Sequence, residues 1–168
     1  MPDLTDEQRA LIGRESTPRP APEAINQAMA SHWCEMVEDA NPIHHDDEYA
    51  KSTWLDGTFA PPTMLFTWAM PPVWPQRNYV SPLGNLNLQG CPNTIAVTAV
   101  QEYEKPLRYG DTLTISSQIA DVSDEKTTRL GTGHFVTTKD IFRNQDEEIV
   151  GTHSFTLFIY RPAGNSGS

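Results

Sequence analysis

The alternation of apolar and polar residues divides the chain into a helix-forming first half and a strand-forming second half. Within residues 22–38, apolar residues recur at three- and four-residue spacing, at Ile25, Met29, Trp33, Met36 and Val37. This spacing predicts one helix with a single apolar stripe. Shorter helices are predicted near residues 5–13 and 46–52. The apolar segment 62–70 (PTMLFTWAM) predicts a buried helix that Pro71 and Pro72 end.

From residue 94 onward the period changes to two. Apolar and polar residues alternate around residues 95–99 and 113–119, and the segments 133–142 and 149–160 flank the polar turn 143–148 (RNQDEE). These patterns predict four antiparallel strands. Residues 105–111 have the composition of a turn with a bulge, and the loop 73–93 holds too many proline and glycine residues for a regular element.

Helices followed by a meander of strands predict an α+β fold in which an antiparallel sheet wraps a buried helix. The proline-rich connector 16–22 (STPRPAP) is expected to be extended. We therefore divide the chain into an N-terminal extension (1–21), a single domain (22–162) and a flexible tail (163–168).

Composition narrows the classes of partner. The 168 residues include 12 basic and 22 acidic side chains, a net charge of −10, which argues against nucleic acid and anionic membranes as partners. Cys34 and Cys91 have no CxxC spacing, so free thiols are expected. No secretion signal or membrane-spanning run is evident, which predicts a cytoplasmic protein.

The stretch 38–50 (EDANPIHHDDEYA) concentrates the candidate chemistry. Asn41 can form an Asx turn and Pro42 fixes φ, so the chain reverses and Asp39 and His44 can face each other across a gap that holds water. Three interpretations are open: a catalytic pair, a solvated acidic turn, and a metal site. The metal interpretation is disfavoured because the adjacent residues 44–47 point in divergent directions.

Six positions in this stretch, Asp39, Asn41, Pro42, Ile43, His44 and Ala50, resemble the signature of MaoC-like enoyl-CoA hydratases, Gly-Asp-x-Asn-Pro-aliphatic-His followed by a small residue. Glu38 departs from the family's glycine. The resemblance implies a hot-dog fold. It assigns Asp39 and His44 to hydration of a trans-2-enoyl-CoA, because that reaction removes a proton from water and delivers one to Cα. The product is a 3-hydroxyacyl-CoA.

The resemblance also implies a backbone N–H for the thioester oxygen at the start of the central helix. Pro61 and Pro62 have no N–H, so Thr63 or Met64 is the expected donor. Asn41 and Pro42 are expected to support the catalytic pair. The coenzyme A belongs to the substrate, so no bound cofactor is expected.

Three segments, 32–43, 60–72 and 131–138, are most similar to the larger subunit of two-component MaoC-like hydratases that act on steroid side-chain CoA thioesters. This likeness implies a bulky acyl group and either a homodimer or a heteromer with a second hot-dog subunit. Two further hypotheses are a non-catalytic acyl-CoA-binding subunit and a hot-dog acyl-CoA thioesterase.

The remaining aromatic and histidine residues are less specific. Tyr49, Trp54 and Trp74 are candidates for the acyl pocket. Packing is the commoner use of side chains such as Tyr49 and Trp54, and contact with a partner is an equal alternative for Trp74. His134 and His153 fall on predicted strands, where structural or interfacial roles are expected.

Overall fold

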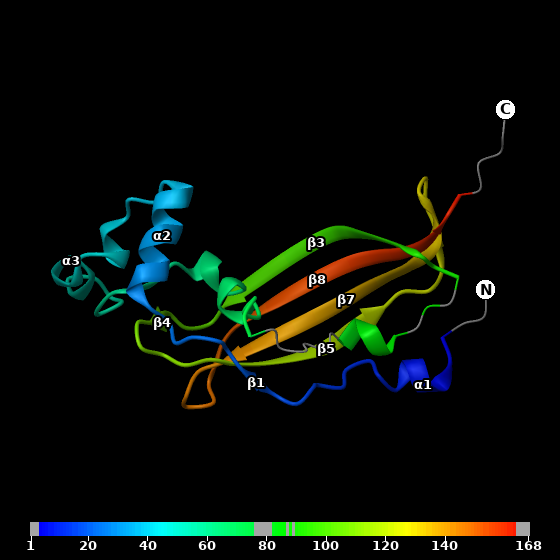
Figure 1. Cartoon of the computed structure of the whole chain (residues 1–168), viewed down its shortest axis with the longest axis horizontal. Coiled ribbons are helices and arrows are strands. Elements are labelled where there is room, and N and C mark those ends of the chain that lie inside the picture. Colours follow the sequence, from blue (N-terminus) through cyan, green and yellow to red (C-terminus); the bar gives the residue numbers. More distant parts are fainter. Residues whose placement is uncertain (1–3, 76–81, 87, 89, 164–168) are drawn as a thin grey trace.

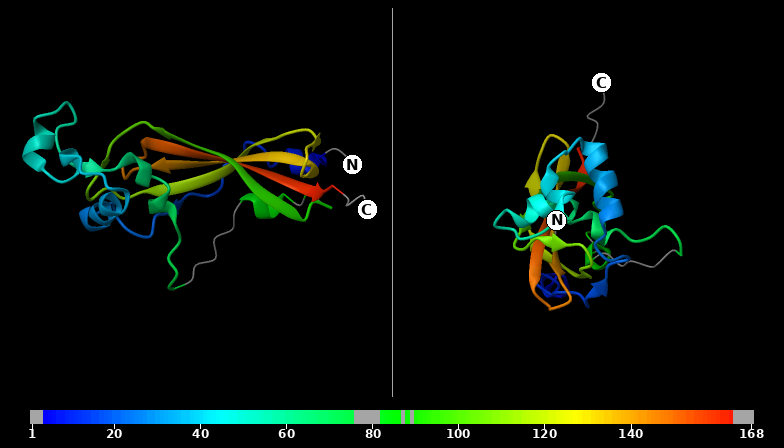
Figure 2. Two further views of the ribbon diagram at one scale, coloured as in Figure 1. Left: turned by 90° about the horizontal axis from the view of Figure 1, so that it is seen from above. Right: turned by 90° about the vertical axis from the view of Figure 1, so that its left-hand side faces the viewer.

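The computed structural model describes residues 4–75, 82–86, 88 and 90–163. Its main element is a twisted antiparallel sheet in the order β1–β5–β7–β8–β3, with β6 paired to β7 (Figures 1 and 2). The strands are β1 (Arg19–Pro20), β3 (Asn93–Tyr103), β5 (Thr114–Val122), β6 (Lys126–Thr127), β7 (Gly131–Arg143) and β8 (Ile149–Pro162). The four predicted strands are present as β3, β5, β7 and β8.

The helices lie mainly beyond one end of this sheet. Figure 1 shows α2 (Gln27–Val37) and α3 (Asp47–Lys51) at that end and the short α1 (Asp6–Arg9) at the other. Asn26 caps α2 by accepting the Met29 N–H, and Asp46 caps α3 by accepting the Tyr49 N–H. Both caps are residues that favour helix starts, which explains why these boundaries occur where they do.

The predicted helix over 62–70 is wrong in its detail. The segment forms two 3₁₀ turns, η2 (Pro62–Met64) and η3 (Thr67–Ala69). Its apolar residues are nevertheless buried, with Met64, Leu65 and Trp68 each no more than 2% exposed. Gly151 on β8 permits the close approach, since an added Cβ would lie 2.8 Å from the Leu65 side chain. The segment therefore packs on the sheet as the central helix of the predicted architecture was expected to do.

A second, two-stranded sheet was not predicted. It pairs β2 (Phe59–Ala60) with β4 (Leu107–Arg108). Strand β4 lies inside residues 105–111, which were expected to form only a turn. Leu107 is buried, and the Arg108 guanidinium donates to the carbonyl oxygens of Gly57 and Leu55. This sheet joins the end of the main sheet to the loops that carry the signature residues.

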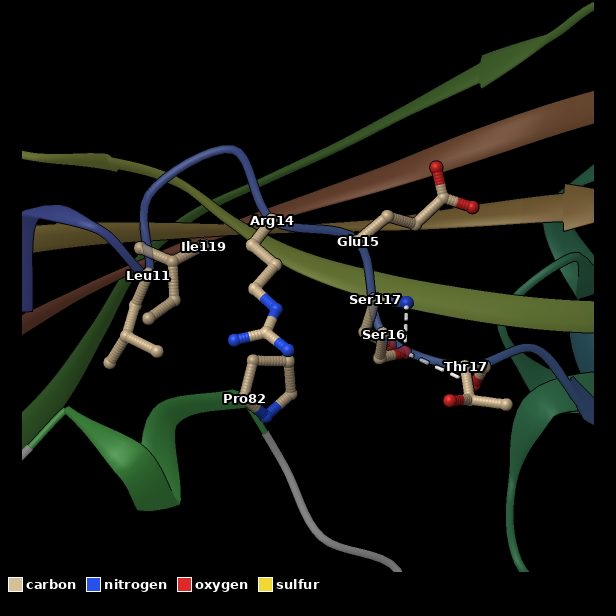
Figure 3. A pocket seen from close by; sticks show the side chains of 8 residues that line it. All are labelled: Leu11, Arg14, Glu15, Ser16, Thr17, Pro82, Ser117 and Ile119. Carbon is tan, nitrogen blue, oxygen red and sulfur yellow. Dashed lines mark hydrogen bonds between the residues drawn. The ribbon is translucent and has the colours of Figure 1, made fainter.

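The N-terminal segment 11–20, here called the arm, runs beside β5. Backbone N–H groups of Gly13 and Ser16 donate to carbonyl oxygens of Ile119 and Ser117, each at 2.8 Å. Figure 3 shows the arm residues along this strand, with Arg14 directed toward Pro82 of η4 (Pro82–Asn85). The arm thereby covers the β5 edge of the sheet. The predicted boundary at residue 21 stays a prediction, as does the flexible tail, of which residues 164–168 lie outside the described residues.

The opposite edge, β3, is open. Almost all of its residues are exposed, including Ile95, Val97, Val100 and Tyr103 at 43–49%. The alternation of apolar and polar residues that predicted this strand does not lead to a buried face in the single chain. No element among the residues that the structure describes buries the apolar side chains of β3. Among the described residues, no helix has the length and apolar character needed to cross a membrane.

Candidate active site

Asp39 and His44 face each other, as the sequence predicted. Asp39 follows α2 directly and His44 ends the 3₁₀ turn η1 (Pro42–His44), and their Oδ2 and Nε2 atoms are 3.7 Å apart. His44 is 4% exposed, whereas the Asp39 side chain is 38% exposed. The pair therefore consists of a buried imidazole and a carboxylate that reaches solvent.

The turn between them follows the expected local chemistry. The Asn41 side chain accepts the Ile43 N–H at 3.2 Å, and the Asp39 Oδ1 accepts the Asn41 N–H at 3.0 Å. Pro42 occupies the first position of η1, where a missing N–H has no consequence. One carboxylate oxygen of Asp39 is thus fixed to the backbone, and the other is left to face His44.

The tautomer of His44 is set by a backbone carbonyl. Its Nδ1 lies 2.9 Å from the carbonyl oxygen of Phe59 on β2. Because a carbonyl oxygen only accepts, Nδ1 carries the proton and Nε2 of the neutral ring is a free base directed at Asp39. A water molecule held between Nε2 and Oδ2 would have two groups able to take its proton.

Tyr109 and Arg108 hold this arrangement from β4 and the turn that follows it. The Tyr109 hydroxyl donates to the His44 carbonyl oxygen at 2.8 Å. Burial, with a smaller contribution from the Cys34 thiol, raises the pKa of Tyr109 to about 12, so the donor keeps its proton at physiological pH. Arg108 pairs with Phe59 and anchors the loop before it. The contacts made by Phe59, Tyr109 and Arg108 were not predicted from the sequence. Phe59 acts through its backbone carbonyl, and residues 105–111 were interpreted only as a turn.

Glu38, the departure from the family signature, lies in the left-handed region with φ 58° and ψ 35°. This conformation is the one that glycine adopts most readily, which gives a physical reason for the family's glycine. The substitution leaves the cap intact, because the Glu38 N–H still donates to the Cys34 carbonyl oxygen. The predicted backbone turn therefore forms with a glutamate in place.

The candidate donors for a thioester oxygen lie on the segment that also orients His44. Met64 N–H already donates to the Pro61 carbonyl oxygen at 3.0 Å. Thr63 lies one residue before Met64 and is exposed. Its N–H makes no hydrogen bond within the described part of the chain. Of the two predicted donors, Thr63 is the one whose N–H is available.

The surroundings of Asp39 are open and acidic. A hollow of about 520 Å³ is lined by Cys34, Glu35, Glu38, Asp39, Ala40 and His45. Burial raises the pKa of the Cys34 thiol, and the charges of Asp39 and Glu35 raise it further. In residues 4–75, 82–86, 88 and 90–163, no group of three His, Cys, Asp or Glu side chains has the arrangement of a metal site.

The predicted acyl-pocket aromatics are largely exposed. Trp54 and Trp74 are 89% and 86% exposed, and Tyr49 is 47% exposed. No ring contact or hydrogen bond joins their side chains to Asp39 or His44 in the described residues. His134 is buried and its Nδ1 lies 2.8 Å from the Ser123 carbonyl oxygen, a contact that holds the chain after β5 against β7. His153 is also buried, on β8.

The fold is that of hot-dog hydratases and dehydratases. Residues 10–153 match the family model described as the FAS1-like dehydratase domain region, so the chain belongs to this family of MaoC-like hot-dog dehydratases. The resemblance and the fold class that the sequence predicted are thereby confirmed.

Two curated relatives are similar over most of the chain. The "Probable enoyl-CoA hydratase alpha subunit" of Thermomonospora curvata is 30% identical over 95% of this chain and 53% of its own length. The "3-oxo-4,17-pregnadiene-20-carboxyl-CoA hydratase alpha subunit" of Mycobacterium tuberculosis is 32% identical over 91% of this chain and 50% of its own. The chain therefore spans about half the length of these relatives.

Solved structures agree with the fold. A chain of the ChsH1-ChsH2 complex from Mycobacterium tuberculosis superposes with a TM-score of 0.84 at 30% identity, covering 97% of this chain and 94% of that one. A MaoC-like dehydratase from Rhodospirillum rubrum superposes with a TM-score of 0.62 at 18% identity, over 90% and 94% of the two chains. The second likeness shows the fold alone.

Proposed function

We propose that this chain is a subunit of a 2-enoyl-CoA hydratase and that Asp39 and His44 perform the hydration. The observation that carries the proposal is the Asp39–His44 geometry. Nε2 of His44, whose Nδ1 is bonded to the Phe59 carbonyl oxygen, faces a solvent-accessible carboxylate at 3.7 Å, on a chain of the dehydratase family. Water held by both groups loses a proton as its oxygen attacks Cβ, and the protonated pair then delivers a proton to Cα.

The proposal assigns the thioester oxygen to Thr63 N–H. Negative charge grows on that oxygen as water adds, and a preorganised backbone donor at the start of η2 stabilises it. The reaction consumes water and the enoyl thioester and releases only a 3-hydroxyacyl-CoA, so no cofactor enters its balance. Coenzyme A is the part of the substrate that is bound and stays chemically unchanged.

We further propose that a second hot-dog subunit completes the site. Phosphates of coenzyme A are anionic, and the hollow beside Asp39 already holds the carboxylates of Glu35 and Glu38. Cationic groups for those phosphates are therefore assigned to the partner. The exposed β3 edge offers unpaired backbone groups and apolar side chains for continuation of the sheet into that partner. The structural likeness to a chain of a two-component complex supports this arrangement.

The proposed substrate is a bulky steroid side-chain enoyl-CoA. Support comes from the printed name of the Mycobacterium tuberculosis relative, a pregnadiene carboxyl-CoA hydratase alpha subunit. The test is a panel of trans-2-enoyl-CoA thioesters, from crotonyl to steroid side-chain esters, assayed by loss of the conjugated thioester absorbance with and without a co-expressed small hot-dog subunit.

The assignment of the pair is tested on the protein that shows activity in this panel. We expect Asp39→Asn and His44→Asn each to lower kcat by about 10²- to 10⁴-fold, the usual range for general acid–base groups. His44→Asn is chosen because the amide can still donate toward the Phe59 carbonyl oxygen. His32→Asn is the matched control, the same change at an exposed histidine of α2 that should keep full activity. Wild-type rates in folded Asp39 and His44 variants would refute the assignment.

A second candidate is a non-catalytic acyl-CoA-binding subunit whose partner performs the hydration. The open, acidic surroundings of Asp39 favour it, because they offer a coenzyme A phosphate no cation from this hollow. The same variants decide between the two candidates. In the assembled enzyme, a binding subunit tolerates Asp39→Asn and His44→Asn with kcat unchanged, whereas a catalytic subunit does not.

A further inference from the structure

A row of polar side chains crosses the sheet at one level. Ser117 on β5 is paired with Asp140 on β7, Asp140 with His153 on β8, and His153 with Gln101 on β3. Directly paired residues of an antiparallel sheet point to the same face. The Ser117 hydroxyl donates to Asp140 Oδ1 at 2.5 Å, which confirms this for the first pair. The row is thus a continuous polar line on a face that also packs against apolar residues.

A pocket of about 260 Å³ opens over the centre of this row. Its apolar lining includes Phe66, Met70, Phe155 and Leu157, contributed by the η3 region and by β8. The Phe66 and His153 rings lie 4.4 Å apart between centroids. An engineered apolar cavity of about 150 Å³ in another protein already holds benzene, so this volume suits a group larger than one six-membered ring.

Asp140 and His153 bring a polar pair into this pocket, whose other polar lining residues are Thr138 and Arg19, the guanidinium of which donates to the Ala69 carbonyl oxygen at 3.0 Å. Their side chains are only 17% and 8% exposed, and Oδ2 of Asp140 lies 3.8 Å from Nδ1 of His153. That separation exceeds a hydrogen bond, and Nδ1 is buried and makes no hydrogen bond within the described residues. A buried donor without a hydrogen-bonding partner is costly, which is the usual signature of a position completed by a ligand or water.

The chemistry of the two atoms defines what completes them. A carboxylate oxygen only accepts, and an imidazole Nδ1 next to a carboxylate carries its proton and donates. A hydroxyl group satisfies both, since it donates to Asp140 and accepts from His153. An oxygen about 2.8 Å from each atom is compatible with their 3.8 Å separation. A ketone oxygen would only accept, and it would face the Asp140 carboxylate unfavourably.

We propose that this pocket binds an apolar group bearing a hydroxyl, and that Asp140 and His153 recognise the hydroxyl. The group belongs either to the distal part of an acyl chain that bears a hydroxyl, in place of the 3-oxo group in the printed name of the Mycobacterium tuberculosis relative, or to a separate apolar alcohol. Only the first source rests on the function proposed above, because binding to the pocket itself requires no hydration activity.

The test compares 2-adamantanol with 2-adamantanone, which share one rigid apolar cage and differ in the polar group. Calorimetric titration should give a dissociation constant about tenfold lower for the alcohol, the scale of one hydrogen bond to a charged group. Asp140→Asn places an amide donor beside the bound oxygen and should abolish or reverse this preference, and His153→Phe, which keeps a ring beside Phe66, should abolish it. Asp121→Asn, the same change on an exposed residue of β5, should retain it.

Because the alcohol-to-ketone ratio is measured within each protein, a general loss of affinity in a variant does not imitate the result. Equal affinities in the wild-type protein, no saturable binding of either probe, or a retained preference in folded Asp140→Asn would overturn the proposal. The source is decided in the hydration assay. A competitive rise in KM on adding 2-adamantanol identifies the acyl group as the occupant, and an unchanged KM at saturating alcohol identifies a separate molecule.

Discussion

Replacement of Glu38 by glycine should stabilise the protein while leaving the proposed active site intact. Glu38 is held at φ 58°, where a residue with a side chain loses about 1–2 kcal/mol. Glycine lacks that penalty but loses about 0.5–1 kcal/mol through its greater freedom in the unfolded chain. The backbone change alone therefore favours glycine by about 0.5–1 kcal/mol.

Charge adds to this gain. Glu38 places a carboxylate at the C-terminal end of α2, where the helix dipole is negative, which costs about 0.3–1 kcal/mol. The two effects together predict an increase of about 1–2 kcal/mol in the free energy of unfolding. For a chain of 168 residues each kcal/mol corresponds to a rise of about 2–4 °C in melting temperature.

The assay is urea denaturation of Glu38→Gly beside Glu38→Ala. Alanine removes the carboxylate but keeps a Cβ in the left-handed region, so it isolates the electrostatic part and should gain less than glycine. The Asp39 N–H keeps its bond to the Cys34 carbonyl oxygen in both variants, and kcat should stay at the wild-type value. If Glu38→Gly were no more stable than Glu38→Ala, the argument from backbone conformation would be wrong.

Three further predictions concern the scaffold. Tyr109→Phe should lower stability by about 1 kcal/mol through loss of the bond to His44. Between about pH 10 and pH 12 the wild-type protein should lose stability, because the raised pKa keeps Tyr109 protonated in the folded state while the same tyrosine ionises in the unfolded chain. Tyr109→Phe should make this loss smaller, and an unchanged slope in alkaline denaturation would contradict the prediction. Gly151→Ala should destabilise the fold by about 1–3 kcal/mol in urea titrations, since its Cβ would meet Glu102 O and Leu65; wild-type stability would show that the approach relaxes freely. Deletion of residues 1–18 should convert the protein to larger species in light scattering, because it uncovers the β5 edge; an unchanged molar mass would refute the protective role of the arm.

The sequence predicted elements whose signals are local. Alternation gave the four long strands, and Asn41-Pro42 gave the turn that brings Asp39 and His44 together. The segment 62–70 was predicted as a regular helix because it is strongly apolar and Pro71 and Pro72 end it. Proline pairs bound the segment on both sides and leave room only for short helical pieces, a length at which 3₁₀ turns are common, and the two turns bury the same apolar residues.

Contacts that depend on tertiary structure gave no sequence signal. The carbonyl of Phe59 orients His44, and any residue would provide that carbonyl. Strands β2 and β4 are two residues each, too short for a detectable alternation. The row through Asp140 and His153 depends on strand register, which residue types alone do not define.

The two edges of the sheet have a consequence for stoichiometry. The arm occupies the β5 side, so in the part of the chain that the structure describes β3 is the one long strand with a free edge, which gives each molecule a valence of one for extension of the sheet by a long strand. Two such strands joined across a dyad axis use up both valences and terminate growth. If the proposed second subunit extends the sheet, it competes for the same strand as another copy of this chain. Relative subunit concentrations would then determine the ratio of homodimer to heterodimer, and the same closure would prevent polymerisation.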